Sequence, residues 1–211
     1  MKTRALLSLV LLSFPSCQER PRAVPSPAGD KASVVLAAVN YPLTYFAERL
    51  AGDFATILFE VPPGEDPAFW EPSDEQVNAI QRADLIFLNG ARYARWTASR
   101  TLPFESTVIT SSAFENTLIT VEGDLRHSHQ PGEEEHSHAG TAATTWLDFK
   151  LASAQALEIA RALEEQYPVQ KESIQRNLAD LQRDLERLDL QMFAATEVLK
   201  DAPIIASHPI Y

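Results

Sequence analysis

The chain has 211 residues, of which 45% are hydrophobic and 22% charged, enough for one sizeable core. Its 29 acidic residues against 18 basic ones give a net charge of −11, which disfavours nucleic acid and anionic membrane surfaces as partners. Cys17 is the only cysteine, so an internal disulfide is excluded.

The first 16 residues have the pattern of an export signal. Lys2 and Arg4 give a basic start, and residues 5–12 form an apolar run that is too short to span a bilayer. The lone Cys17 that follows resembles the lipobox cysteine of bacterial lipoproteins, whose thiol is acylated. We therefore predict a signal peptide over residues 1–16 and, after the lipidated Cys17, a flexible proline-rich tether over residues 17–31.

Four short apolar runs predict β-strands in the first half of the remaining chain. They are residues 34–39, 56–61, 85–88 and 107–110. Short apolar strands joined by helices predict an α/β fold with a parallel sheet, whose ligands bind beyond the carboxyl ends of the strands. We therefore expect an N-terminal α/β lobe over residues 32–166, with a site in the loops after Val61 and Leu88.

Helical segments separate these strands and follow them. One opens at Pro42 and ends near Gly52, and another begins at Ser73, a predicted N-cap with Gln76 at the capping-box spacing. Residues 146–165 form a third helical segment.

A longer helix follows Pro168, with apolar residues at alternating spacings of four and three. They are Ile174, Leu178, Leu181, Leu185, Leu188, Met192, Ala195 and Leu199, which we call the heptad seam. A helix over residues 172–200 would be roughly 43 Å long, more than one lobe needs for cover. We therefore expect this linking helix, within residues 167–201, to pair with another chain or to run into a second lobe.

A new apolar segment begins at Pro203, and His208 stands at its end. We assign residues 202–211 to the first strand of a C-terminal lobe. A strand that is begun and then abandoned would expose an unpaired edge, so we expect the sequence to be a partial one.

Four of the five histidines form two His-Ser-His triplets within a loop over residues 122–145. They are His127, His129, His136 and His138, with three glutamates at residues 133–135 between the triplets. Imidazole and carboxylate are ligands of zinc and its neighbours, and alternate residues of an extended segment project to one side. The tract is a compositional signal for metal binding, and the structural alternative is a solvated loop that binds nothing.

The order of these motifs resembles that of the zinc/manganese-type solute-binding proteins of bacterial ABC importers. The motifs are the first apolar strand, Asp66-Pro67, Glu71-Pro72-Ser73, Ala83 to Gly90, the His-rich loop, Trp146-Leu147-Asp148, the long helix and Ser207-His208. The resemblance implies two α/β lobes joined by a rigid helix. It also implies a metal ion bound in the cleft, delivery to a membrane permease, and no catalysis.

The chain departs from the family at two cleft positions. Where the resemblance implies a histidine after the Asp-Pro, this sequence has Ala68, and where it implies one before Trp-Leu-Asp, this sequence has Thr144. His208 matches the third cleft histidine, and the fourth ligand, an acid, would lie beyond Tyr211.

Two interpretations of the His-rich loop follow. In the first, one or both triplets fold into the cleft and replace the missing histidines, together with Glu65, Asp66 or Glu71. In the second, the loop only raises the local metal concentration. Glu71 and Asp148 also have an ordinary structural explanation as a helix cap or a loop hydrogen bond, and the three tryptophans are expected in the core or the cleft wall.

We expect an exported, lipid-anchored monomer, in the periplasm or on the outer face of the cytoplasmic membrane. It would capture a divalent transition metal, zinc rather than manganese, and deliver it to an ABC transporter permease. The alternative is a structural or adhesive surface lipoprotein whose His-rich loop scavenges metal. A metalloenzyme is disfavoured because the chain lacks a His-Glu-x-x-His helix, a Gly-x-Ser-x-Gly elbow and a phosphate-binding glycine loop.

Acylation of Cys17 is testable by fractionation. The wild-type protein should partition with membranes, because multiple acyl chains anchor firmly, and Cys17→Ala should stay unprocessed or be mislocalised. Recovery of the wild type as a soluble, unmodified protein that begins downstream of Cys17 would contradict the prediction.

Overall fold

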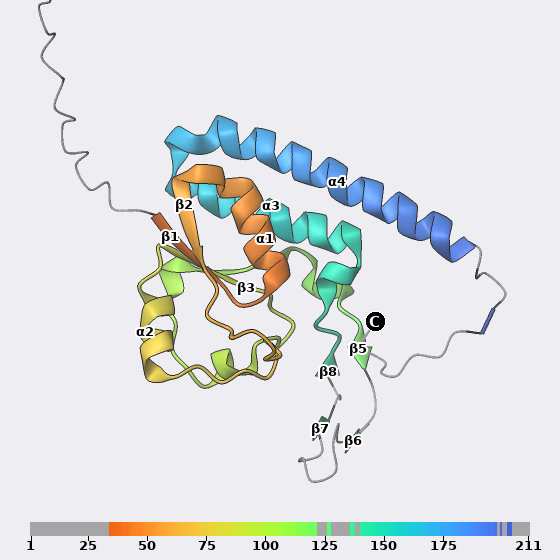
Figure 1. The fold of residues 1–211 in the computed structure, drawn as a ribbon, viewed down its shortest axis with the longest axis horizontal. Helices are drawn as coiled ribbons and strands as arrows, with labels where there is room; N and C mark the ends of the chain where they lie inside the picture. Colours follow the sequence, from red (N-terminus) through yellow and green to blue (C-terminus); the bar gives the residue numbers. More distant parts are fainter. Residues whose placement is uncertain are drawn as a thin grey trace, which may run out of the picture. The chain divides into compact units, whose positions relative to one another are not determined.

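A parallel four-stranded sheet forms the centre of the lobe, with strand order β2-β1-β3-β4 (Figure 1). The computed structural model describes residues 34–121, 126–127, 136–137, 140–197, 199 and 202–203. The strands are β1 (Val34–Ala38), β2 (Ala55–Leu58), β3 (Leu85–Leu88) and β4 (Thr107–Ile109). The predicted parallel α/β architecture is confirmed. Edge strand β2 is shorter than predicted because its register with β1 stops at the pair Ala37–Leu58.

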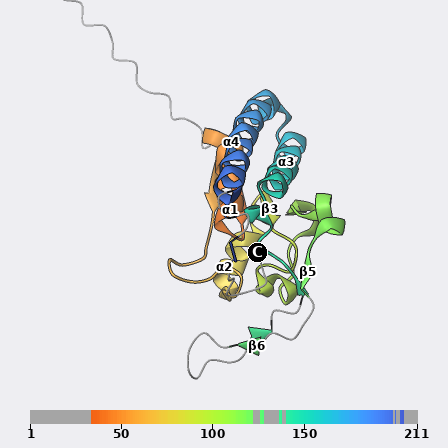
Figure 2. The same cartoon turned by 90° about the vertical axis from the view of Figure 1, so that its right-hand side faces the viewer.

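Helices cover both faces of this sheet. They are α1 (Tyr41–Ala51), α2 (Asp74–Gln81), α3 (Phe149–Gln166) and α4 (Lys171–Glu197). Helices α1, α3 and α4 lie on one side and α2 on the other (Figures 1 and 2). Short 3-10 helices join them: η1 (Gly52–Phe54), η2 (Arg95–Ala98), η3 (Phe104–Ser106), η4 (Ser112–Thr117), η5 (Thr145–Leu147) and η6 (Pro168–Gln170). Within the described residues no helix is both long enough and apolar enough to cross a bilayer.

Side chains at the helix N-termini fix where the helices begin. The Asn40 side chain accepts from the Leu43 amide and caps α1, and Ser73 and Gln76 form the predicted reciprocal capping box of α2. Asp148 caps α3 by accepting from two amides of its first turn. The structural explanation of Asp148 is therefore confirmed.

The core lies between the sheet and the α1–α3 layer. Leu36 and Phe87 from the central strands, with Leu43, Ile159 and Leu163 from the helices, are almost fully buried. These apolar side chains supply most of the stabilising free energy, at about 25 cal/mol per Å² of area removed from water.

Two of the three tryptophans are also core residues. Trp70 and Trp96 pack edge to face with their ring centroids 6.4 Å apart, and both are buried. They join the loop after β2 to η2, as predicted for structural rather than ligand-binding tryptophans.

The heptad seam of α4 divides into a buried half and an exposed half. Ile174, Leu181 and Leu185 are at most 5% exposed, whereas Leu188 is 41% and Met192 54% exposed. Helix α4 is about 40 Å long by its rise per residue, and its C-terminal half extends beyond α1 (Figure 1). The first half therefore holds the helix on this lobe. That the second half pairs with another chain or runs into a second lobe stays a prediction.

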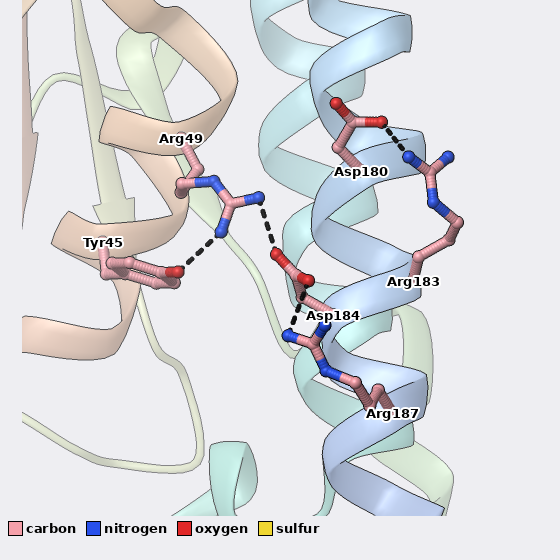
Figure 3. A network of polar contacts seen from close by, with 6 residues as sticks. All are labelled: Tyr45, Arg49, Asp180, Arg183, Asp184 and Arg187. Atoms are coloured by element: carbon pink, nitrogen blue, oxygen red, sulfur yellow. Dashed lines mark hydrogen bonds and ion pairs between the residues drawn. The ribbon is translucent and has the colours of Figure 1, made fainter.

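Polar contacts add to this attachment of α4. The Arg49 guanidinium on α1 donates to the Tyr45 hydroxyl at 2.6 Å and to Asp184 on α4 at 3.0 Å, and Asp184 also accepts from Arg187 (Figure 3). The Arg49 and Asp184 side chains are 30% and 37% exposed, so their ion pair contributes roughly 0.2–1 kcal/mol. The buried leucines therefore dominate the attachment.

Truncating the two halves of the seam should have different effects. Leu185→Ala should lower the free energy of unfolding by about 2–5 kcal/mol, because it leaves a cavity among buried side chains. The matched control Leu188→Ala, on the exposed half, should cost about 0.5 kcal/mol or less. Equal losses for both variants in denaturant titrations would mean that α4 packs differently.

Candidate metal site

The described part of the His-rich loop pairs one histidine of each triplet. Strand β6 (Arg126–His127) pairs antiparallel with β7 (His136–Ser137), and His127 is the register partner of His136. The alternation of an extended segment predicted proximity within each triplet but not this pairing between triplets. His129, His138, His208 and the glutamates at residues 133–135 lie outside the described residues, as do the predicted signal peptide, Cys17 and the tether.

A second antiparallel pair forms the base of this hairpin. Strand β5 (Thr120–Val121) pairs with β8 (Gly140–Thr141), and the Ala142 amide donates to the Ile119 carbonyl at 2.7 Å. The segment therefore leaves the lobe and returns to it side by side. Periodicity did not predict these pairs because each strand is only two residues long.

A buried polar cluster lies where the segment returns to the sheet. Its members, which we call the strand-end network, are Asn40, Asn89, Thr110, Thr145 and Gln155, all at most 6% exposed. Asn89, directly after β3, donates to the Gly90 carbonyl at 3.2 Å and to the Ala143 carbonyl at 2.9 Å.

Three further bonds of the network converge on Gln155 of α3. Its side-chain amide donates to the Asn89 side-chain oxygen at 3.1 Å and to the Thr110 hydroxyl at 2.8 Å. Its own oxygen accepts from the Thr145 hydroxyl at 3.2 Å. Strand ends, helix and returning segment are thus joined by one set of hydrogen bonds.

A tight left-handed turn follows Asn89. Gly90 has φ = 76°, and Ala91, Arg92 and Ala94 also have positive φ, near 50–60°. A Cβ at Gly90 would lie 2.0 Å from Ser111 Oγ, so glycine is required there for space as well as for conformation. Strain of this kind is kept only where the surrounding structure holds it.

The turn places Tyr93 against Trp146 of the returning segment. Their rings meet edge to face with centroids 5.2 Å apart. Burial, reinforced by the negative charge of Asp66, raises the pKa of the Tyr93 phenol above its ordinary value. Tyr93 therefore keeps its proton at neutral pH and offers a neutral hydroxyl rather than a phenolate.

The loop after β2 is tied to the same turn. The Ala68 carbonyl accepts from the Arg95 amide at 3.2 Å, and the Asp66 carboxylate accepts from the Ala68 amide at 2.9 Å. Glu65, Asp66 and Glu71 are all exposed. The loops after the second and third strands, where a site was predicted, therefore meet at residues 89–95.

The two positions without the expected histidine lie close to these contacts. Ala68 itself bonds to Asp66 and Arg95. Ala143 and Thr145, on either side of Thr144, are bonded to the strand-end network.

Among the described residues no three His, Cys, Asp or Glu side chains gather closely enough to hold a metal ion.

Comparison with known proteins gives a consistent set of matches. The family model described as zinc-uptake complex component A, periplasmic, matches residues 36–211. A manganese ABC transporter substrate-binding lipoprotein, PsaA, of Streptococcus anginosus is 28% identical over 188 residues, covering 89% of this chain and 58% of the relative. The zinc-binding lipoprotein AdcA of Streptococcus pneumoniae is 24% identical over 208 residues, covering 98% and 40% respectively. The chain thus spans about half the length of these relatives.

Solved structures share the fold. Fe(III)-bound YtgA from Chlamydia trachomatis aligns with a TM-score of 0.65 at 20% identity, over 81% of this chain and 55% of that one. A crystal structure of ZnuA aligns with a TM-score of 0.63 at 24% identity, over 84% and 64%.

The left-handed turn can be tested by an exchange of small residues. Gly90→Ala should destabilise the protein by about 1–3 kcal/mol, because the new Cβ meets Ser111 and the φ angle is unfavourable. Ala91→Gly, at a neighbouring positive φ, should be neutral or slightly stabilising. A Gly90→Ala variant that unfolds at the wild-type denaturant concentration would show that the turn is not as described.

Proposed function

The chain belongs to the zinc-uptake complex component A family, and from this premise we propose that it captures zinc outside the cytoplasm and delivers it to an ABC importer permease. The matched relatives are named as substrate-binding proteins of metal transporters. A metalloenzyme is therefore set aside. The relatives carry the names of both zinc and manganese proteins, so the choice of zinc rests on the residues of this chain. Imidazole suits zinc, whereas manganese favours oxygen ligands.

The observation that carries the proposal is the pairing of His127 with His136. Directly opposed residues are the closest neighbours across an antiparallel ladder. The pairing joins one residue from each of two triplets that are separated by six residues of sequence, so one metal ion could draw ligands from both. Zinc takes three or four protein ligands, which two triplets can supply.

We propose His127, His129, His136 and His138 as the first ligands of the metal ion. Where the segment reaches the strand ends, carboxylates of the loop after β2 would complete the set, with Glu65 and Glu71 preferred over Asp66. Asp66 already accepts from the Ala68 amide, which holds one of its oxygens in the turn. His208, from the predicted first strand of the C-terminal lobe, is proposed as a further ligand.

We also propose a monomer that is anchored to the membrane through Cys17. The relatives named as lipoproteins support the anchor. The rival interpretation is a structural or adhesive lipoprotein that self-associates through the exposed half of α4. There Leu190, Met192 and Phe193 are all more than half exposed. Light scattering with and without zinc separates the two, because only self-association through α4 gives a dimer or a larger species.

Removing the four loop histidines should weaken zinc binding. The quadruple variant His127→Ala, His129→Ala, His136→Ala, His138→Ala should have a lower zinc stoichiometry, or an affinity at least tenfold lower, by isothermal titration calorimetry. The matched control Ser128→Ala/Ser137→Ala changes the same segment without touching an imidazole and should bind like the wild type. Affinity should fall as the pH is lowered through about 6.5, because protonated imidazole does not bind metal.

The two interpretations of the loop give different titrations. If the loop completes the cleft site, the quadruple variant loses the tight binding step. If the loop is only a scavenger, the tight step survives and weak additional sites disappear. Identical zinc binding by the quadruple variant and the wild type would remove the loop from the proposed function.

A further inference from the structure

The His-rich loop returns to the sheet on residues 143–146, and this segment is held by contacts with other parts of the chain. The Ala143 carbonyl accepts from Asn89, the Thr145 hydroxyl donates to Gln155, and the Trp146 ring packs on Tyr93. Asn89 is 54 residues from Ala143 in sequence, whereas Gln155 of α3 is 10 residues from Thr145. The return segment is therefore attached both to the turn after β3 and to α3.

We propose that the bonds from Asn89 and Gln155 of the strand-end network to Ala143 and Thr145 fix this return segment against the sheet and thereby set the metal affinity of the His-rich loop. The effect on affinity rests on the proposed function, whereas the effect on the backbone does not. Thr145 is the positioning residue, because it is the only member of the network that lies on the return segment itself.

The hydrogen bonds of the network define a single arrangement of its amides. The Asn89 side-chain nitrogen faces two carbonyls and the Gln155 side-chain nitrogen faces two acceptors, so neither amide can flip without losing bonds. The Thr110 hydroxyl in turn donates to the Leu88 carbonyl at 3.0 Å. Because all members are buried, a lost bond leaves a polar atom without water to replace its partner.

The return segment is close enough along the chain to affect the histidines. Ala143 lies two residues after β8 and seven residues after His136 of β7. A fixed return end restricts the positions open to β7 and to its partner β6. Ligands held near their binding geometry bind metal more tightly, because less conformational entropy is lost on binding.

A matched pair of isosteric variants tests the positioning role. Thr145→Val and Thr110→Val each remove one buried hydroxyl from the same network, but only Thr145 lies on the return segment. Zinc titration of the full chain should give an affinity at least tenfold lower for Thr145→Val and within about threefold of the wild type for Thr110→Val. Thr145→Ser, which keeps the hydroxyl, should restore the affinity.

Hydrogen exchange of the metal-free chain supplies a readout that does not depend on zinc. Amides of residues 141–147 should exchange faster in Thr145→Val than in Thr110→Val, while both variants show a similar fall in melting temperature. The proposal is overturned if Thr145→Val exchanges and binds zinc like the wild type, or if Thr110→Val changes both properties equally. A wild-type chain that binds no zinc would defeat the proposed function, and selective exchange in Thr145→Val would still support the positioning of the backbone.

Discussion

The full burial of the Asn89 amide is the constraint on which the candidate site depends. A buried amide needs partners for both its nitrogen and its oxygen, and in this protein they come from four separate parts of the chain. The requirement brings together the ends of the central strands, helix α3 and the segment that returns from the His-rich loop. One side chain after β3 thus determines how the segment that returns from the His-rich loop meets the α/β frame.

The long helix contributes in a different way. The buried half of its heptad seam packs on α1 and α3 and makes α4 part of the lobe, whereas the exposed half continues as an apolar surface beyond it. Since the helix is attached by leucines rather than by ion pairs, its direction is fixed by shape complementarity and changes little with ionic strength. A rigid lobe with a rigid projecting helix is a suitable support for a site built on loops.

Local signals made much of the fold predictable from the sequence. The apolar runs gave the four strands, and the spacing of Ser73 and Gln76 gave the reciprocal capping box. Asp148 was predictable as a cap because its partners lie two and three residues away. The heptad seam predicted a continuous helix. The helix is longer than the lobe, and the exposed half of the seam is the part that extends beyond it.

The candidate site was less predictable because its contacts are distant in sequence or lack a local signal. Asn89 and Gln155 are 66 residues apart, and nothing in either residue's neighbourhood indicates the bond. The positive φ angles at Arg92 and Ala94 could not be predicted, because neither residue is a glycine. The pairing of His127 with His136 depends on the strand register. Hydrophobic alternation cannot indicate the register when each strand is only two residues long. The strand pattern did identify the loops after Val61 and Leu88 in advance, and the family resemblance identified the positions of Ala68 and Thr144.

X-ray absorption at the zinc edge of the zinc-loaded protein identifies the atoms bound to the metal ion and so tests whether the His-rich loop supplies its ligands. If both His triplets supply the ligands, the spectrum should require at least two imidazole nitrogens at about 2.0–2.1 Å, with the multiple scattering of the imidazole ring. A first shell made of water or carboxylate oxygens alone, without imidazole scattering, would contradict the account.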